Sequence, residues 1–318
     1  MTDPTPTGPT STDPTSAARP STDPTSATPE GGSVIHDLGY RPYTGARLGA
    51  AAIARALVIT GFRNAFGLGR SGKSKVLPFI LLALNLMPAI IVGGVMVFVG
   101  LDELPIGYAQ YASTTQVLLG IFVASQAPVL FSRDLRHGTI SLYLARPLPS
   151  STYAMARWAS LLGATLVFLL LPILLLYAVA LLGELDVSEQ TGDAAIAVAL
   201  ALLLAMSLTG LAGLIASWST RRGFAVVATI ALLLIGNGIV TAIQGISHEE
   251  GQPRVGEVAG LFSPYSLYRG LMSVWTDNEA LTPPTGTPMQ LAYLVVFVAL
   301  AAGCLGALVW RYRRVATA

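Results

Sequence analysis

The stretch LPFILLALNLMPAIIVGGVMVFV, residues Leu77–Val99, decides the fold, because it is long, almost wholly apolar and free of charge. A helix needs about 20 apolar residues to cross the hydrocarbon core of a bilayer. Five further stretches have the same character: roughly Thr115–Phe131, Trp158–Gly183, Ala194–Trp218, Phe224–Gln244 and Met289–Trp310. We therefore predict an all-α, polytopic membrane protein with six transmembrane helices.

The overall composition agrees with a membrane protein. Of the 318 residues, 53% are hydrophobic and only 11% are charged, whereas a soluble domain carries about 25% charged residues. The formal net charge of +2 is too small to indicate a nucleic-acid partner. The single cysteine, Cys304, lies in an apolar run and excludes an intramolecular disulfide or a cysteine-based metal site. We expect no metal and no other cofactor.

The connections between the predicted spans alternate in charge. The segment before the first span, the loop 133–157, the stretch STRRG and the C-terminal RYRRVATA are basic, while the connections between them are acidic. Basic loops stay in the cytoplasm. Both termini and the loop 133–157 are therefore predicted to be cytoplasmic, and the loop 245–288 external. Arginine and alanine are abundant, as in proteins from GC-rich bacterial genomes, so we expect a multi-pass protein of a bacterial plasma membrane.

The N-terminal part divides into two segments before the transmembrane domain, residues 77–318. Residues 1–39 contain a Pro-, Thr- and Ser-rich decapeptide repeat that has almost nothing to bury, so they are predicted to be a disordered cytoplasmic tail. Residues 40–76 are predicted to form an interfacial amphipathic helix, from Ala46 to Phe66, and a basic linker. The alternative for this helix is packing against a partner.

The linker contains GLGRSGKS, Gly67–Ser74, which matches the phosphate-binding P-loop pattern. A P-loop joins a buried strand to a helix, but here an amphipathic helix precedes the motif. We interpret the segment as a basic linker in which Arg70, Lys73 and Lys75 meet anionic lipid headgroups. The chain is accordingly not expected to be an enzyme.

The six predicted stretches contain no Asp, Glu, Lys, Arg or His. A charged residue at mid-bilayer costs about 2.5–3.5 kcal/mol on insertion scales and is usually kept for function. Its absence argues against a self-powered proton-coupled carrier and against an intramembrane hydrolase. The neutral polar residues either bond to neighbouring helices or line a substrate path, for which the candidates are Asn85, Gln126, Asn237 and Thr241.

The segment RDLRHGTISLYLARPLPSSTYAMARW, Arg133–Trp158, is too long for a hairpin turn. Residues 133–145 are predicted to form a short helix of about three turns along the membrane, which Pro147 and Pro149 stop. Its purpose is either to dock a partner or simply to anchor the topology with basic residues.

Two motifs resemble the permease subunits of ABC-2 type transporters. The first is the order of Asp134, Gly138, Thr139, Pro147 and Tyr153 in the loop after the second span, although the family usually has glutamate at the acidic position. The second is LFSPYSLYRGLMSVW, Leu261–Trp275, which is similar to the family's external segment.

The resemblance implies a permease subunit that pairs with a second permease subunit, as a homodimer or heterodimer, and rests on a separate ABC ATP-binding subunit. It also implies that the short cytoplasmic helix between spans 2 and 3 is a coupling helix. The docking residues expected on that basis are Arg133, Asp134, Gly138, Thr139, Leu142 and Pro147, with Asp134 meeting a base on the partner. Export is the expected direction, and membrane lipids are the other partner.

A second interpretation is a membrane scaffold that docks a cytoplasmic partner and transports nothing, and a membrane-embedded enzyme is a third. A neighbouring reading frame with Walker A and Walker B motifs would favour the permease, whereas a neighbour without ATPase motifs would favour the scaffold. The sequence does not identify a substrate.

The topology can be tested with Ala145→Cys, Val187→Cys and Glu250→Cys, each in a Cys304→Ala background. An impermeant thiol reagent applied to intact cells should label positions 187 and 250 and leave 145 unlabelled, because only the acidic connections face outward. Permeabilised cells, in which all three positions should react, serve as the control. Labelling at 145 with none at 187 or 250 would invert the predicted orientation.

Overall fold

The computed structural model describes residues 45, 49–101, 103–136, 148–219, 221–276 and 278–317, and every regular element in these ranges is a helix. The described helices belong to one compact unit, Arg47–Ala318. The predicted tail, residues 1–39, lies outside the described residues. The helices are α1 (Ala50–Ala65), α2 (Lys73–Val99), α3 (Tyr108–Thr114), α4 (Gln116–Leu130), α5 (Ser132–Arg136), α7 (Ser150–Leu182), α8 (Val187–Trp218), α9 (Arg222–Ile230), the π-helix η1 (Ala231–Ile235), α10 (Gly236–Glu249), α11 (Pro253–Gly260), α12 (Pro264–Trp275) and α13 (Gly286–Thr317).

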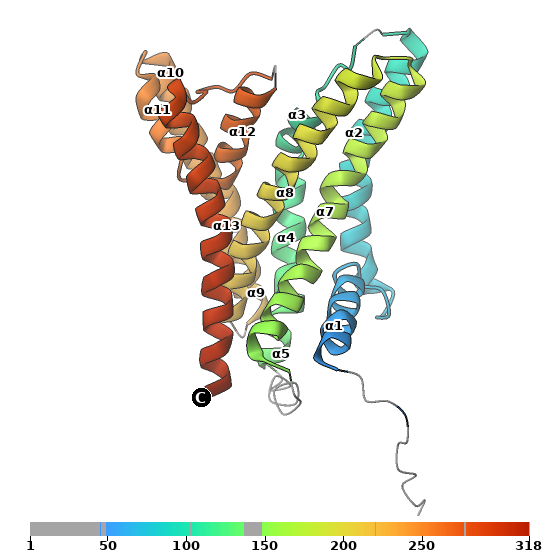
Figure 1. The fold of residues 1–318 in the computed structure, drawn as a ribbon, viewed down its shortest axis with the longest axis vertical. Coiled ribbons are helices and arrows are strands. Elements are labelled where there is room, and N and C mark those ends of the chain that lie inside the picture. Colours follow the sequence, from blue (N-terminus) through green and yellow to red (C-terminus); the bar gives the residue numbers. More distant parts are fainter. Residues whose placement is uncertain are drawn as a thin grey trace, which may run out of the picture. The chain divides into compact units, whose positions relative to one another are not determined.

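Six helical segments of this unit are long and apolar enough to cross a membrane, which confirms the predicted number of spans. They are α2, α4 with α5, α7, α8, α9 through α10, and α13. In Figure 1, α1, α5 and the C-terminal end of α13 lie at one end of the bundle, and α3, α10, α11 and α12 lie toward the other. We call these the basic end and the acidic end, after the charges of the connections found there.

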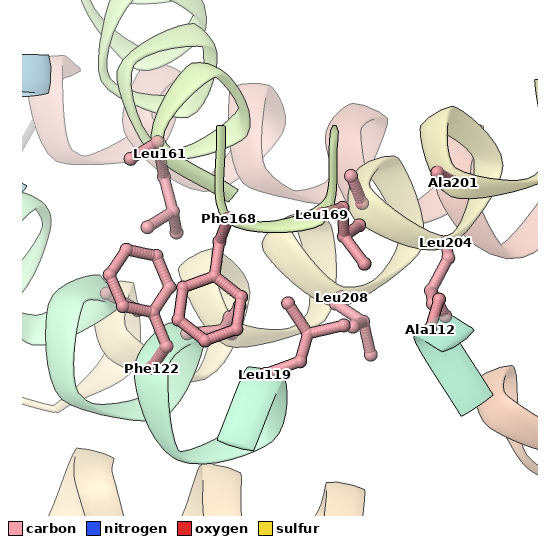
Figure 2. Packing of buried hydrophobic residues seen from close by; sticks show 14 of the residues in the cluster. Ala112, Leu119, Phe122, Leu161, Phe168, Leu169, Ala201, Leu204 and Leu208 are labelled. Atoms are coloured by element: carbon pink, nitrogen blue, oxygen red, sulfur yellow. The ribbon is translucent and has the colours of Figure 1, made fainter. Parts of the chain in front are cut away.

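Helices α7 and α8 form the centre of the bundle. Helix α7 packs against α1, α2, α4, α8 and α13, and α8 also contacts α3, α9 and α12. Figure 2 shows Phe122 of α4 beside Phe168 of α7, with their ring centroids 4.8 Å apart in a stacked arrangement. Leu204 and Leu208 of α8 lie on the other side of this core. The three helices are therefore joined by large side chains with almost no exposed surface.

The outer helices expose apolar residues that only lipid or a partner subunit could cover. The most apolar window of the α4–α5 span is 67% buried, whereas those of α2 and of α9 through α10 are 28% and 22% buried. Large hydrophobic side chains such as Ile90, Val97 and Phe98 stand outward on α2. A soluble protein buries such apolar side chains in its core, whereas this bundle exposes them on its surface. The exposure of apolar side chains fits a bundle that is surrounded by the hydrocarbon of a bilayer.

Helix α7 begins earlier than its hydropathy predicts, at Ser150 instead of near Trp158. The backbone N–H of Tyr153 already donates to the carbonyl of Pro149, so helical hydrogen bonding starts two turns before the apolar run. As a result Arg157 lies within this membrane-spanning helix and is buried. The apolar stretch 158–183 itself contains no charged residue, as expected, and Arg157 lies in the turns of α7 that precede it.

A tyrosine from α3 inserts into the hydrogen-bond ladder of α2 next to Pro88. The Tyr111 hydroxyl accepts a hydrogen bond from the Ala89 N–H over 3.2 Å and donates one to the carbonyl oxygen of Asn85. A side chain in the ladder is one of the established causes of a local break in a helix. Both backbone groups stay satisfied, as hydrocarbon surroundings require, and α2 is tied to α3.

The predicted external loop, residues 245–288, is largely helical and not an open loop. Helix α10 continues to Glu249, and α11 and α12 occupy much of the remainder. Tyrosines hold α12 in place, since Tyr268 donates to the carbonyl of Ala109 over 2.6 Å and Tyr265 to that of Gln116 over 3.2 Å. Burial raises the pKa of both hydroxyls, so they remain protonated donors.

Helix α1 confirms the helix predicted over Ala46–Phe66 and packs along α7 of its own chain. Its buried face is Leu57, Gly61 and Ala65, which lie four residues apart. A Cβ built on Gly61 would lie 2.3 Å from the Ser160 hydroxyl oxygen. That hydroxyl donates to the carbonyls of Ala156 and Val58, so the two helices meet where only glycine fits.

Replacing Gly61 by valine should push α1 away from α7 and lower the thermal unfolding temperature of the purified protein. Overpacking of this kind costs about 1–3 kcal/mol. The matched control is Gly94→Val on α2, where a built Cβ meets nothing within 4 Å. An equal loss of stability in both variants would mean that valine acts through helix propensity alone and that the α1–α7 contact is not tight.

Candidate functional site

The candidate docking loop is closed at its base by a group of three side chains, which we call the α5–α7 clasp. Asp134 of α5 accepts hydrogen bonds from the hydroxyl of Tyr153 and from the guanidinium Nη2 of Arg157, both on α7. The Nε of Arg157 also donates to the Tyr153 hydroxyl over 3.2 Å. The clasp thus fixes the residues on either side of residues 137–147.

Three further contacts anchor α5 and the clasp to the rest of the bundle. Ser132 donates to the carbonyl of Ala216 on α8 over 2.7 Å. The Tyr312 hydroxyl on α13 donates to the carbonyl of Phe131 over 3.4 Å, and its ring lies 5.5 Å from that of Tyr153. The junction between α4 and α5 is therefore tied to α7, α8 and α13.

The clasp lies in a largely dry environment. The side chains of Arg157 and Asp134 are 6% and 14% exposed, respectively. Hydrogen bonds in which both partners are charged are roughly twice as strong as neutral ones. Leaving either charge alone at such a site costs about 3–5 kcal/mol, whereas an exposed pair contributes about 0–1 kcal/mol. Separating Arg157 from Asp134 would therefore cost several times more free energy than separating an exposed pair.

One predicted docking residue already has a charged partner within the chain. Asp134 pairs with Arg157 of α7, and that it also meets a base on a partner subunit stays a prediction. Arg133, next to it, is exposed at the basic end. Four of the predicted docking residues lie outside the described residues: Gly138, Thr139, Leu142 and Pro147.

Two of the four candidate path residues come together at the acidic end. The Arg269 guanidinium of α12 donates to the Thr241 hydroxyl over 2.9 Å and reaches the amide oxygen of Asn237 at 3.5 Å. The Ser263 hydroxyl donates to the same amide oxygen over 2.8 Å. Asn237 and Thr241 thus bond to α12, and we call this group the Arg269 cluster.

The other two candidates lie apart from this cluster. Asn85 is buried and donates from its amide to the carbonyl of Phe168 over 2.8 Å, which joins α2 to α7. Gln126 is also buried and donates to the adjacent Ser125 hydroxyl over 2.9 Å. Within the described part of the chain, no hydrogen bond links either residue to Asn237 or Thr241.

Arg269 holds its charge without a carboxylate. Among the described residues the only ion pair is that of Arg157 with Asp134, so neutral oxygens alone accept from Arg269. Burial lowers the pKa of Arg269 below its ordinary value, and Tyr293 nearby acts in the opposite direction. A half-buried cation held by amide and hydroxyl oxygens is suited to an anionic group or to a polar contact that opens and closes.

Sequence reasoning treated Arg157 and Arg269 only as loop charges. Arg157 could have been found, because it follows Tyr153 by four residues and such residues share a helix face. Arg269 left no comparable signal, since its partners lie 28 and 32 residues away on another helix.

The segment Gly67–Ser74 joins α1 to α2, so a helix stands where a P-loop has its strand. Gly67 has a φ of +67° and a built Cβ would lie 2.5 Å from the carbonyl oxygen of Ser74. The Ser74 hydroxyl donates to the carbonyl of Ser71 over 2.7 Å. The glycine pattern therefore serves a tight turn between two helices.

Comparison with known proteins gives no relative on which to base an assignment. No protein-family model matches the chain, and no curated protein matches its sequence.

Separating the charges of the clasp should destabilise the protein. Asp134→Asn and Arg157→Gln are each expected to lower the free energy of unfolding in detergent micelles by about 3–5 kcal/mol, because each removes one partner of a buried ion pair. The double variant should lose less than the sum of the two losses. Glu250→Gln, at an exposed residue of the acidic end, is the control. Losses that simply add would show that Asp134 and Arg157 are not coupled.

Proposed function

We propose that this chain is the transmembrane permease subunit of an ABC-2 type exporter, which docks a separate ATP-binding subunit through the loop 133–157. The observation that supports this most strongly is the α5–α7 clasp. Asp134 and Tyr153, two residues of the motif that resembles the family's, bond to each other and tie the loop to the helices that would have to move. A loop that only anchored the topology would need its basic residues but not a buried charge pair.

The clasp also gives a physical route from the loop to the membrane helices. A partner that pushes on residues 137–147 would act on α5, which continues α4, and on the first turns of α7. Because the clasp is nearly dry, its bonds resist separation, and the two helices would be displaced together. Coupling by rigid displacement of packed helices is a common form of conformational transmission.

At the acidic end, the fifth span has the irregularity expected of a moving element. The π-helix Ala231–Ile235 interrupts it, and π-helical turns occur frequently at functional sites. The Arg269 cluster follows directly, through Asn237 and Thr241. We propose that α12 and α10 form the outer gate, and that the Arg269 contacts to neutral oxygens are exchanged when the gate opens.

In this proposal the basic end is cytoplasmic and the acidic end is external, in a bacterial plasma membrane. The exposed apolar faces of α2 and of α9 through α10 then meet lipid or a second permease subunit, identical or different. The chain itself would not hydrolyse ATP, and the substrate is left open.

The proposal can be tested by expressing the chain together with the protein encoded by the neighbouring reading frame and reconstituting the pair in liposomes. Gly138→Leu and Leu142→Glu should reduce co-purification and ATPase rate at least tenfold, because both substitutions fall in the proposed docking helix. The controls are Gly192→Leu, where a built Cβ meets nothing within 4 Å, and the exposed Val255→Glu of α11. Both controls should behave as wild type.

Two outcomes would contradict the proposal. A neighbouring subunit without ATPase activity that still binds the loop would support the scaffold interpretation. Unchanged co-purification and ATPase rate in both loop variants, together with an inverted topology after replacement of Arg133 and Arg136, would show that the loop is only an anchor.

A further inference from the structure

Four arginines from three separate parts of the chain line one cavity at the basic end. Arg70 comes from the turn before α2, Arg133 and Arg136 from α5, and Arg222 from the first residue of α9. Pro128, Val129 and Ser132 are the other described residues of the lining, and none of the described lining residues is acidic. Its volume is about 220 Å³, below the roughly 300–1,000 Å³ of sites that enclose a drug-sized ligand, and it suits a small charged group.

The carboxylate nearest in sequence to Arg133 and Arg136 has a charged partner on α7. Asp134 lies between Arg133 and Arg136 in sequence, but its carboxylate is engaged by Arg157 in the α5–α7 clasp. Arg70, Arg133 and Arg222 form no ion pair with any other described residue. Burial lowers the pKa of Arg70, and the charges of Arg133 and Arg222 lower it further, which places these guanidinium groups within electrostatic reach of one another.

A second feature also favours an anion at this position. Arg222 begins α9, and the side chain at the N-cap, Arg221, does not cap the helix. The first N–H groups of a helix have no acceptor within it, and they carry a partial positive charge toward the end of the helix. The N-terminal turn of α9 therefore adds to the field of the four arginines.

The position of the cavity in the bundle indicates what kind of anion would bind. Arg70 lies three residues before the candidate span Lys73–Val99, Arg136 ends the span Gln116–Arg136, and Arg222 begins the span Arg222–Glu249. The cavity therefore lies where three membrane spans end, at the level of the lipid headgroups. An anionic lipid bound there would place its phosphate at the arginines and its acyl chains along the spans, which an acidic peptide or a free phosphate cannot do.

We infer that the cavity lined by Arg70, Arg133, Arg136 and Arg222 binds the phosphate-bearing headgroup of an anionic phospholipid from the leaflet at the basic end. Arginine suits this task because its planar guanidinium donates two parallel hydrogen bonds to phosphate. Basic pockets between transmembrane helices are an established form of lipid headgroup site. The bound lipid would join the linker, α5 and α9, and its binding does not depend on the proposed transport function.

The test is native mass spectrometry of the full chain in detergent, titrated separately with phosphatidylglycerol and phosphatidylcholine. Wild type should retain one phosphatidylglycerol in preference to phosphatidylcholine. A basic residue near an anionic headgroup contributes roughly fivefold in affinity, so Arg70→Gln/Arg222→Gln should bind phosphatidylglycerol roughly 25-fold more weakly. Arg63→Gln/Arg313→Gln removes two exposed charges outside the cavity lining and should change the affinity less than twofold.

Four results would overturn the inference. An equal loss of affinity in the two double variants would mean that only the overall charge matters. Displacement of the lipid by millimolar inorganic phosphate would identify a free-phosphate site, and tighter binding of a hexaglutamate peptide would identify a protein-docking surface. If the glutamine variant does not fold, Arg70→Lys and Arg222→Lys keep the charge but lose the paired donors; an unchanged preference for phosphatidylglycerol in both would also contradict the headgroup site.

Discussion

Hydrocarbon offers no hydrogen-bond partner, and this constraint governs the whole bundle. Each backbone N–H and C=O in a span must be satisfied inside the protein, because an unsatisfied group costs several kcal/mol there. The long helices meet this demand directly. Where the ladder of α2 is interrupted near Pro88, the Tyr111 hydroxyl serves both exposed backbone groups. Two hydroxyls within the spans are satisfied in the same way, as Thr209 and Thr229 donate to carbonyls one turn earlier.

The same cost explains why the buried Arg157 and the half-buried Arg269 have hydrogen-bond partners close by. Arg157 can be buried in α7 because Asp134 and Tyr153 accept hydrogen bonds from its guanidinium group. This ion pair of Arg157 and Asp134 lies near the N-terminal end of α7, at the basic end of the bundle. Arg269 is half-buried on α12, which is not one of the spans, and rests on neutral oxygens. The first arrangement is costly to separate and suits a fixed joint. The second is held more weakly, which suits a contact that is exchanged.

In the proposed transporter, the two ends of the bundle have different roles. At the basic end, the α5–α7 clasp would transmit force from the docking loop, while the arginine-lined cavity would hold a lipid headgroup beside it. At the acidic end, α12 and α10 meet just beyond the π-helix of the fifth span. Between the two ends, the stacked rings of Phe122 and Phe168 join α4 to α7 in the core.

The sequence alone determined the all-helical class, the six spans and the helix over Ala50–Ala65, because apolar length and periodicity depend only on neighbours along the chain. It also indicated why Gly67–Ser74 is not a P-loop, since the residues before it predict a helix. Only the tertiary structure decided that Asp134 pairs with Arg157 and that Arg269 joins Asn237 to Thr241. It also brought Arg70, Arg133 and Arg222 to one cavity. These features arise from contacts between residues far apart in sequence. The residues next to a charged side chain in the sequence do not indicate which distant side chain will pair with it once it is buried.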